Sequence, residues 1–189
     1  MRTQKSHQSG FSLVELLTVV AIIGILALVT VPNFVTYFQS NKMKAAMRNF
    51  TSDLRTMREY SITQGVQTKI TFTPDTKSTP SSRAYDFWQG NSAFNSTTWT
   101  QLTQPNFAQA PLIKGYTRHL EDIAYFPTSA AQTFTATNGV YSVIFYPDGR
   151  VGMPSSTATT ASVILKTDMK VPQPQYSIDL SPSGRVYAH

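Results

Sequence analysis

An uninterrupted apolar run over residues 11–31 constrains this chain more than any other feature of its sequence. The run contains one charged side chain, Glu15, and it follows a polar leader that carries Arg2 and Lys5 and no acidic residue. As an α-helix that rises about 1.5 Å per residue, the run would reach about 30 Å, the thickness of bilayer hydrocarbon. The sequence therefore predicts one helix that is long enough to span a membrane.

The residues on either side of the run predict its orientation. The apolar core is longer than the roughly 7–15 residues of a cleaved secretory signal, and Pro32 closes it. Positive charges beside a span stay on the cytoplasmic side, so the leader predicts an inside N-terminus. We expect a single-pass protein whose C-terminal bulk faces the periplasm or the exterior.

Glu15 is the unusual residue of the run, because a carboxylate inside a span costs roughly 2.5–3.5 kcal/mol without a partner. Cleavage after Gly10 would create an α-amino group on Phe11. This amine could neutralise the carboxylate within one chain or between neighbouring chains. Alternatively, Glu15 lies at the helix start, where the macrodipole favours an acidic residue and headgroup water is close. The Gly-Phe junction favours the first interpretation.

Gly10, Phe11 and Glu15 together resemble the signature of type IV pilins and pseudopilins, which is a basic leader ending in Gly, then Phe, then Glu at the fifth mature position. The resemblance implies that an inner-membrane prepilin peptidase cuts between Gly10 and Phe11 and methylates the new Phe11 amine. It also implies that Glu15 pairs with the N-terminus of an adjacent subunit during filament assembly. Gly24 and Pro32 match positions where the helix loosens in such filaments, as expected of residues that weaken helices. Close helix packing is an equal alternative for Gly24.

An amphipathic helix is predicted to follow at residues 33–65, with Gly65 as its stop. Its apolar positions recur at three- and four-residue spacing, which predicts a stripe packed on a head domain more than a binding groove. The stripe consists of Met43, Met47, Phe50, Leu54, Met57 and Ser61.

The periodicity changes to two after Gly65, which predicts a first strand over residues 66–72. Residues 123–126, 141–146, 162–166 and 176–180 read as further strands. We therefore predict an α+β fold, with a long N-terminal helix packed on an antiparallel β-sheet head. The predicted organisation is a leader at 1–10, a transmembrane and assembly helix at 11–32, the amphipathic helix at 33–65 and a periplasmic head at 66–189. We expect an insertion at about 73–121 that is folded and has long loops. Its aromatic residues are expected to pack locally under these loops, and a platform that binds sugars or bases is the less favoured alternative.

Two segments of the head have the same turn sequence. Residues 145–151 and 180–186 each contain Pro-x-Gly followed by Arg150 or Arg185, which predicts paired hairpins. These turns resemble the H-type (GspH) minor pseudopilins of type II secretion and the FimT and FimU minor pilins. The resemblance implies a minor structural subunit that primes a pilus or pseudopilus, with other pilins and the inner-membrane assembly platform as partners.

DNA binding in DNA uptake is the alternative function, because some FimT-type minor pilins bind DNA through a C-terminal Gly-Arg-x-Arg motif. Gly184 and Arg185 match this motif, whereas Tyr187 stands where the second Arg should be. Arg185 and Arg150 could hold phosphate, with Tyr187 as a stacking face. Otherwise each Arg is a solvated turn residue or pairs with a nearby aspartate, Asp148 or Asp179.

Composition argues against enzymatic and metal-dependent functions. The chain has no cysteine, which removes disulfides, thiolate metal sites and a Cys nucleophile. His119 lies near Glu121 and Asp122 without the spacing of a helical zinc site, so a surface turn is expected there. The net charge of +6 lies mostly on the leader and the helix, so the head is not a strongly cationic nucleic-acid surface. We expect no catalysis, cofactor or metal.

Overall fold

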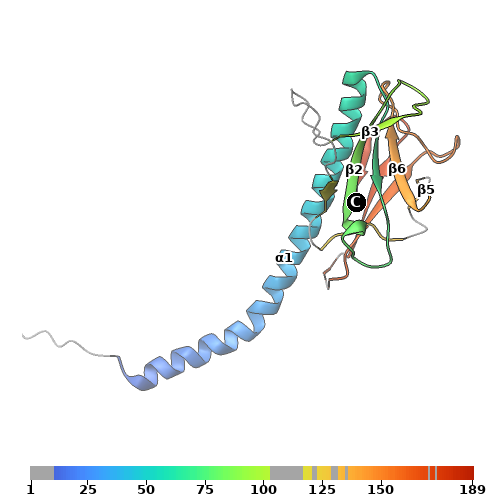
Figure 1. Ribbon diagram of the computed structural model, residues 1–189. Coiled ribbons are helices and arrows are strands. Elements are labelled where there is room, and N and C mark those ends of the chain that lie inside the picture. The colour runs from blue at the N-terminus through green and yellow to red at the C-terminus, as the bar shows by residue number, and fades with distance from the viewer. Residues whose placement is uncertain are drawn as a thin grey trace, which may run out of the picture. The chain divides into compact units, whose positions relative to one another are not determined.

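The computed structural model describes residues 11–102, 117–120, 123–128, 132–134, 136–169, 171–172 and 174–189, without the side chains of residues 29–33. The chain divides into two compact units, Met1–Phe38 and Gln39–His189. One long helix, α1 (Leu13–Gln64), contributes to both units (Figure 1). Gly65 ends α1 as predicted, because it adopts a φ of +66° and its N–H donates to the Ser61 carbonyl at 3.0 Å.

Apolar side chains on every side of α1 are exposed in the first unit. The exposed fraction is 76% for Phe11 at the start of the segment and 78% for Leu28. Among the residues that the structure describes, no helix combines the length and the apolar character needed to cross a membrane. The α1 backbone continues through Pro32, whose side chain lies outside the described residues.

The second unit contains two antiparallel sheets (Figure 1). The first has the order β3-β2-β1-β6-β5, with β4 pairing to β2. Its strands are β1 (Thr68–Phe72), β2 (Ala84–Gly90), β3 (Trp99–Leu102), β4 (Thr117–His119), β5 (Ala136–Thr137) and β6 (Val140–Phe145), and a 3-10 turn, η1 (Ser81–Arg83), leads into β2. The second sheet has the order β7 (Ala161–Lys166), β8 (Gln175–Leu180) and β9 (Val186–Ala188). This architecture confirms the predicted α+β fold.

The predicted stripe on α1 forms one wall of the core. Its members are buried, apart from the partly buried Met47. Alternate residues of β1, Ile70 and Phe72, face the same core, as expected of a sheet with one covered face. The ring of Phe50 meets Tyr85 edge-on at 5.0 Å between centroids. The hydrophobic core thus joins α1 to side chains from both sheets.

Two predictions about the head were wrong. Residues 123–126 do not form a strand, because their backbone hydrogen bonds go to two different segments. Tyr125 exchanges two 2.9 Å hydrogen bonds with Lys166, whereas the Phe126 N–H donates to the Ser82 carbonyl at 2.8 Å. The aromatic residues of the insertion do not all pack locally under loops. Tyr85 and Phe87 lie on β2 in the central core. Phe107 lies outside the described residues.

Candidate functional site

The predicted processing and assembly residues lie at the start of α1. Phe11 lies two residues before the helix and Glu15 lies in its first turn, and both are exposed. The Thr18 hydroxyl donates to the Glu15 backbone carbonyl at 2.8 Å. A Cβ on Gly24 would have no side chain or distant backbone atom within 4 Å, so close packing at Gly24 would require a second chain. Gly10 lies outside the described residues.

The two turns of matching sequence have the same conformation. In the first, the Gly149 N–H donates to the Tyr146 carbonyl at 2.9 Å, and the Tyr146 N–H donates to the Arg150 carbonyl at 3.0 Å. The turn at residues 181–185 repeats both bonds at 2.9 and 3.0 Å. Their glycines adopt φ angles of +81° and +82°, a left-handed conformation that favours glycine. The paired-hairpin prediction is therefore confirmed, since each turn reverses the chain between antiparallel residues.

The paired turns also contact each other and α1. The Val151 N–H donates to the Pro182 carbonyl at 3.1 Å, which joins the turns directly. From α1, Arg58 donates through Nε to the Gly149 carbonyl at 2.8 Å and through Nη2 to the Ser183 carbonyl at 3.3 Å. One guanidinium thus fixes both turns to the helix, because its donors point in a rigid fork.

The arginines of the two turns have different surroundings. Arg150 Nε lies 2.6 Å from the Asp148 carboxylate, and its guanidinium lies over the Tyr146 ring at 5.7 Å. The Arg150 N–H also bonds this carboxylate, and that bond holds the pKa of Asp148 below its ordinary value. The ion-pair interpretation is thus confirmed for Arg150. Ser183 takes the place of Asp148 in the second turn, and Arg185 is exposed.

Arg185 and Tyr187 lie together on a pocket of about 370 Å³ between α1 and the turn that precedes β9. The other lining residues are Arg55, Arg58, Glu59, Gly184 and Val186. The structure therefore brings together two of the three residues of the predicted DNA site and leaves Arg150 outside. Sequence reasoning missed Arg55 and Arg58 at this site, although their three-residue spacing places them on one side of a helix.

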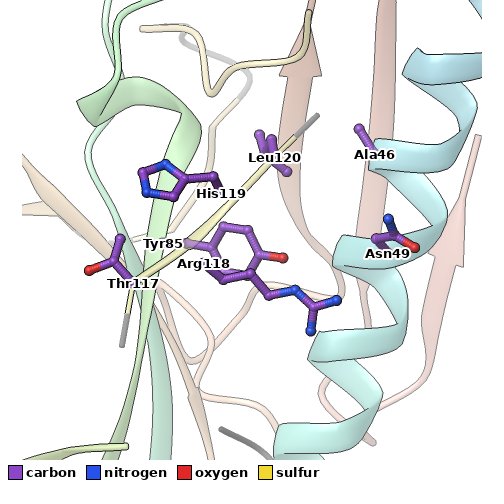
Figure 2. A pocket seen from close by; sticks show the side chains of 7 residues that line it. All are labelled: Ala46, Asn49, Tyr85, Thr117, Arg118, His119 and Leu120. Carbon is purple, nitrogen blue, oxygen red and sulfur yellow. The ribbon is translucent and has the colours of Figure 1, made fainter. Parts of the chain in front are cut away.

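A second polar pocket, of about 300 Å³, lies between β4 and α1 (Figure 2). Arg118 reaches across Tyr85 toward the helix, whereas His119 points to the other side of β4. The buried Asp53 accepts hydrogen bonds from the Tyr85 hydroxyl at 2.6 Å and from Arg118 Nη1 at 2.8 Å. Burial raises the pKa of Asp53, although the bonds from Tyr85 and Arg118 oppose this shift. The network attaches β4 to α1.

The sequence cluster around His119 is not assembled into a metal site in the described part of the chain. His119 is exposed, and both Glu121 and Asp122 lie outside the described residues. Within those residues, no group of three or more His, Cys, Asp or Glu side chains is placed to hold a metal ion.

Comparison with known families gives two matches. One family model, described as a prokaryotic N-terminal methylation motif, matches residues 5–31. The other, described as type II transport protein GspH, matches residues 46–184. The second match begins in α1 and extends to the second paired turn, so it covers most of the chain.

Several known proteins are similar to parts of this chain. The type IV major fimbrial protein FimA of Dichelobacter nodosus is 40% identical over 68 residues, which are 36% of this chain and 43% of FimA. A fimbrial protein of Pseudomonas aeruginosa is 39% identical over 67 residues, covering 35% of this chain and 43% of that protein. The chain thus spans less than half the length of these curated relatives.

Two solved structures are similar to this chain. The minor pseudopilin EpsH from the type 2 secretion system of Vibrio cholerae has a TM-score of 0.48 and 13% identity, covering 78% of this chain and 96% of the EpsH chain. The type IV minor pilin FimU of Pseudomonas aeruginosa has a TM-score of 0.45 and 11% identity, covering 81% and 92%. The two family matches confirm the resemblance found in the sequence. The chain therefore belongs to the type II transport protein GspH family of the type IV pilin superfamily, whose members are membrane-anchored structural subunits and not enzymes.

Proposed function

We propose that this chain is a minor subunit that primes a type IV pilus or a type II secretion pseudopilus. The observation that carries the proposal is the exposed apolar surface of α1 in the first unit, most of which lies within the matched N-terminal methylation motif at residues 5–31. Exposed apolar surface of this extent requires lipid or other helices to cover it. Before assembly, lipid covers this surface. In the filament, the helices of other pilins or pseudopilins cover it instead.

The N-terminal residues have separate roles in this proposal. A prepilin peptidase cleaves between Gly10 and Phe11 and methylates the Phe11 amine. The Glu15 carboxylate then pairs with the N-terminus of a neighbouring subunit, which removes the cost of an unpaired charge in an apolar environment. Gly24 and Pro32 allow the helix to loosen on assembly, because glycine and proline both weaken a helix.

The proposed location is the bacterial inner membrane, with a single pass and the head in the periplasm until the subunit enters a filament. The basic leader supports this orientation, because Arg2 and Lys5 favour the cytoplasmic side. The inner-membrane assembly platform is the proposed partner during extraction.

The intact mass of the chain purified from membranes tests the processing step. We expect a mature species that begins at methylated Phe11 in cells with prepilin peptidase. The full chain should remain in cells without the peptidase and in a Gly10→Val variant. An uncut chain in every sample would mean an ordinary membrane anchor and would contradict the proposal.

DNA binding is a second candidate function, favoured by the shared pocket of Arg185 and Tyr187. Arg185 would contact phosphate and Tyr187 would stack on a base. Arg150 contributes less than expected, because Asp148 holds its guanidinium. An Arg185→Ala variant should bind single-stranded DNA more weakly and with a smaller salt dependence, whereas unchanged titration curves would exclude this function.

A further inference from the structure

Two pockets that meet at Arg55 form a trough between α1 and the C-terminal hairpin, which we name the α1–β9 trough. The first is the 370 Å³ pocket of Arg185 and Tyr187. The second, of about 290 Å³, is lined by Met47, Arg48, Thr51, Ser52, Arg55 and Ala188. Arg55 lines both pockets and donates through Nη2 to the Val186 carbonyl at 3.3 Å, which fixes its guanidinium between them.

The charged residues of the trough favour an anionic occupant. Arg48, Arg55 and Arg185 are exposed, and Glu59 is the acidic side chain among the lining residues. Arg58 is already bonded to two turn carbonyls and lies deeper. The trough is thus lined by three exposed guanidinium groups and one carboxylate, a distribution that attracts acidic partners.

The shape of the trough suits a short extended polypeptide. The distance along α1 from Arg48 to Arg58 is about 15 Å, at about 1.5 Å per residue. An extended chain covers this distance with about four or five residues, at about 3.3 Å each. Met47, Val186 and Ala188 supply apolar contacts beside the arginines. The occupant should therefore combine acidic with apolar side chains.

We propose that the α1–β9 trough binds an extended acidic peptide segment of a neighbouring filament subunit. The identity of this partner rests on the proposed filament function, whereas the peptide chemistry rests on the trough itself. A peptide is favoured over a nucleic acid because Glu59 repels a continuous line of phosphates and because Arg150 is held by Asp148 outside the trough. A peptide can also place a neutral side chain beside Glu59.

Fluorescence anisotropy of a labelled Asp-Glu-Leu-Asp-Glu peptide, titrated with the full chain in detergent, tests this proposal. We expect binding that weakens with salt, and no comparable binding of the amide analogue Asn-Gln-Leu-Asn-Gln. An Arg55→Glu variant should bind the acidic peptide at least about tenfold more weakly, since tenfold corresponds to the modest energy of one close charge pair. Lys44→Glu is the matched control, because Lys44 is an exposed cation of the same helix outside both pockets. Its affinity should stay within about twofold of the unchanged chain.

A charge exchange separates loss of the site from loss of the fold. The variant with both Arg55→Glu and Arg185→Glu should bind Lys-Lys-Leu-Lys-Lys, which the unchanged chain should not bind. Equal weakening by Arg55→Glu and Lys44→Glu, or failure of the unchanged chain to prefer the acidic peptide, would overturn the proposal. Displacement of the peptide by a tighter-binding single-stranded oligonucleotide would assign the trough to DNA instead. None of these results depends on N-terminal processing or filament entry, so failure of the filament function would be seen separately.

Discussion

At the glycines of the paired turns, neighbouring atoms occupy the space that a side chain would need. A Cβ on Gly184 would contact the Gly149 carbonyl oxygen and the Arg58 side chain, and Gly184 has a φ of +82°. A Gly184→Ala substitution should lower the free energy of unfolding by about 3 kcal/mol or more, because steric overlap adds to backbone strain. Urea unfolding curves would measure the loss.

Gly139 provides the matched control for this prediction. It has a φ of +78°, but a Cβ there would have no atom within 4 Å. Gly139→Ala should therefore cost only the left-handed strain, about 1–2 kcal/mol. Equal losses at both glycines would contradict the close approach of the turns and Arg58.

The raised pKa of Tyr125 predicts a specific loss of stability in alkaline solution. Burial, together with its 2.9 Å hydrogen bond to Asp168, raises the pKa of Tyr125 to about 12 from an ordinary value of 10.0. The folded state thus holds this proton more tightly than the unfolded state. The stability that results is fully present below pH 10.0 and is lost as the pH rises to about 12.

A Tyr125→Phe variant tests this linkage. Its free energy of unfolding should fall less steeply between these pH values than that of the unchanged chain, because the linked proton is absent. The comparison between the two proteins cancels the other groups that titrate in this range. Identical slopes would show that the proton of Tyr125 is held equally in the folded and unfolded states.

The two turn arginines show how far local sequence predicts a site. Asp148 lies two residues before Arg150, and this local feature was enough to anticipate their ion pair. For Arg185, the decisive neighbours are Arg55 and Arg58, which are distant in sequence. Periodicity showed where the helix was basic and could not show which turn would face it.

At the scale of elements, α1 and the two hairpin turns depend on each other through Arg58. Its guanidinium supplies hydrogen bonds to the Gly149 and Ser183 carbonyls. Arg58→Ala should lower the free energy of unfolding by about 1–3 kcal/mol, because the buried Gly149 carbonyl would lose its partner. Arg48→Ala, at an exposed position of the same helix, should change it by at most about 0.5 kcal/mol. Equal effects in thermal or urea unfolding would contradict the proposed attachment.

The elements with a regular pattern were predicted correctly, and those defined by distant partners were not. The stripe from Met43 to Ser61 and strand β1 follow from periods of 3.6 and two. Residues 123–126 are apolar enough for a strand, but their hydrogen bonds go to Lys166 and Ser82 in different parts of the fold. Strand β2 pairs with the preceding strand β1, but a polar segment separates them in the sequence, so the insertion was not recognised as part of the main sheet.

At the scale of the whole molecule, the two compact units were predictable to different extents. The residues proposed to act in processing and assembly, Gly10, Phe11 and Glu15, belong to one continuous motif, so they could be named from sequence. The α1–β9 trough of the second unit combines residues from α1 and the C-terminal hairpin, and it required the fold. The family match covers most of this second unit and identifies its class.

The amount of this chain in sheared, purified filaments is the most direct test of a filament role. Filaments would be compared from cells that express the unchanged chain, Glu15→Ala or Lys44→Ala, the last being an exposed charged residue of the same helix outside the α1–β9 trough. The unchanged chain and Lys44→Ala should be recovered in the filaments, whereas Glu15→Ala should remain in the membrane fraction because its N-terminal pairing is lost. Equal recovery of Glu15→Ala, or absence of the unchanged chain from every filament, would contradict the role proposed for this subunit.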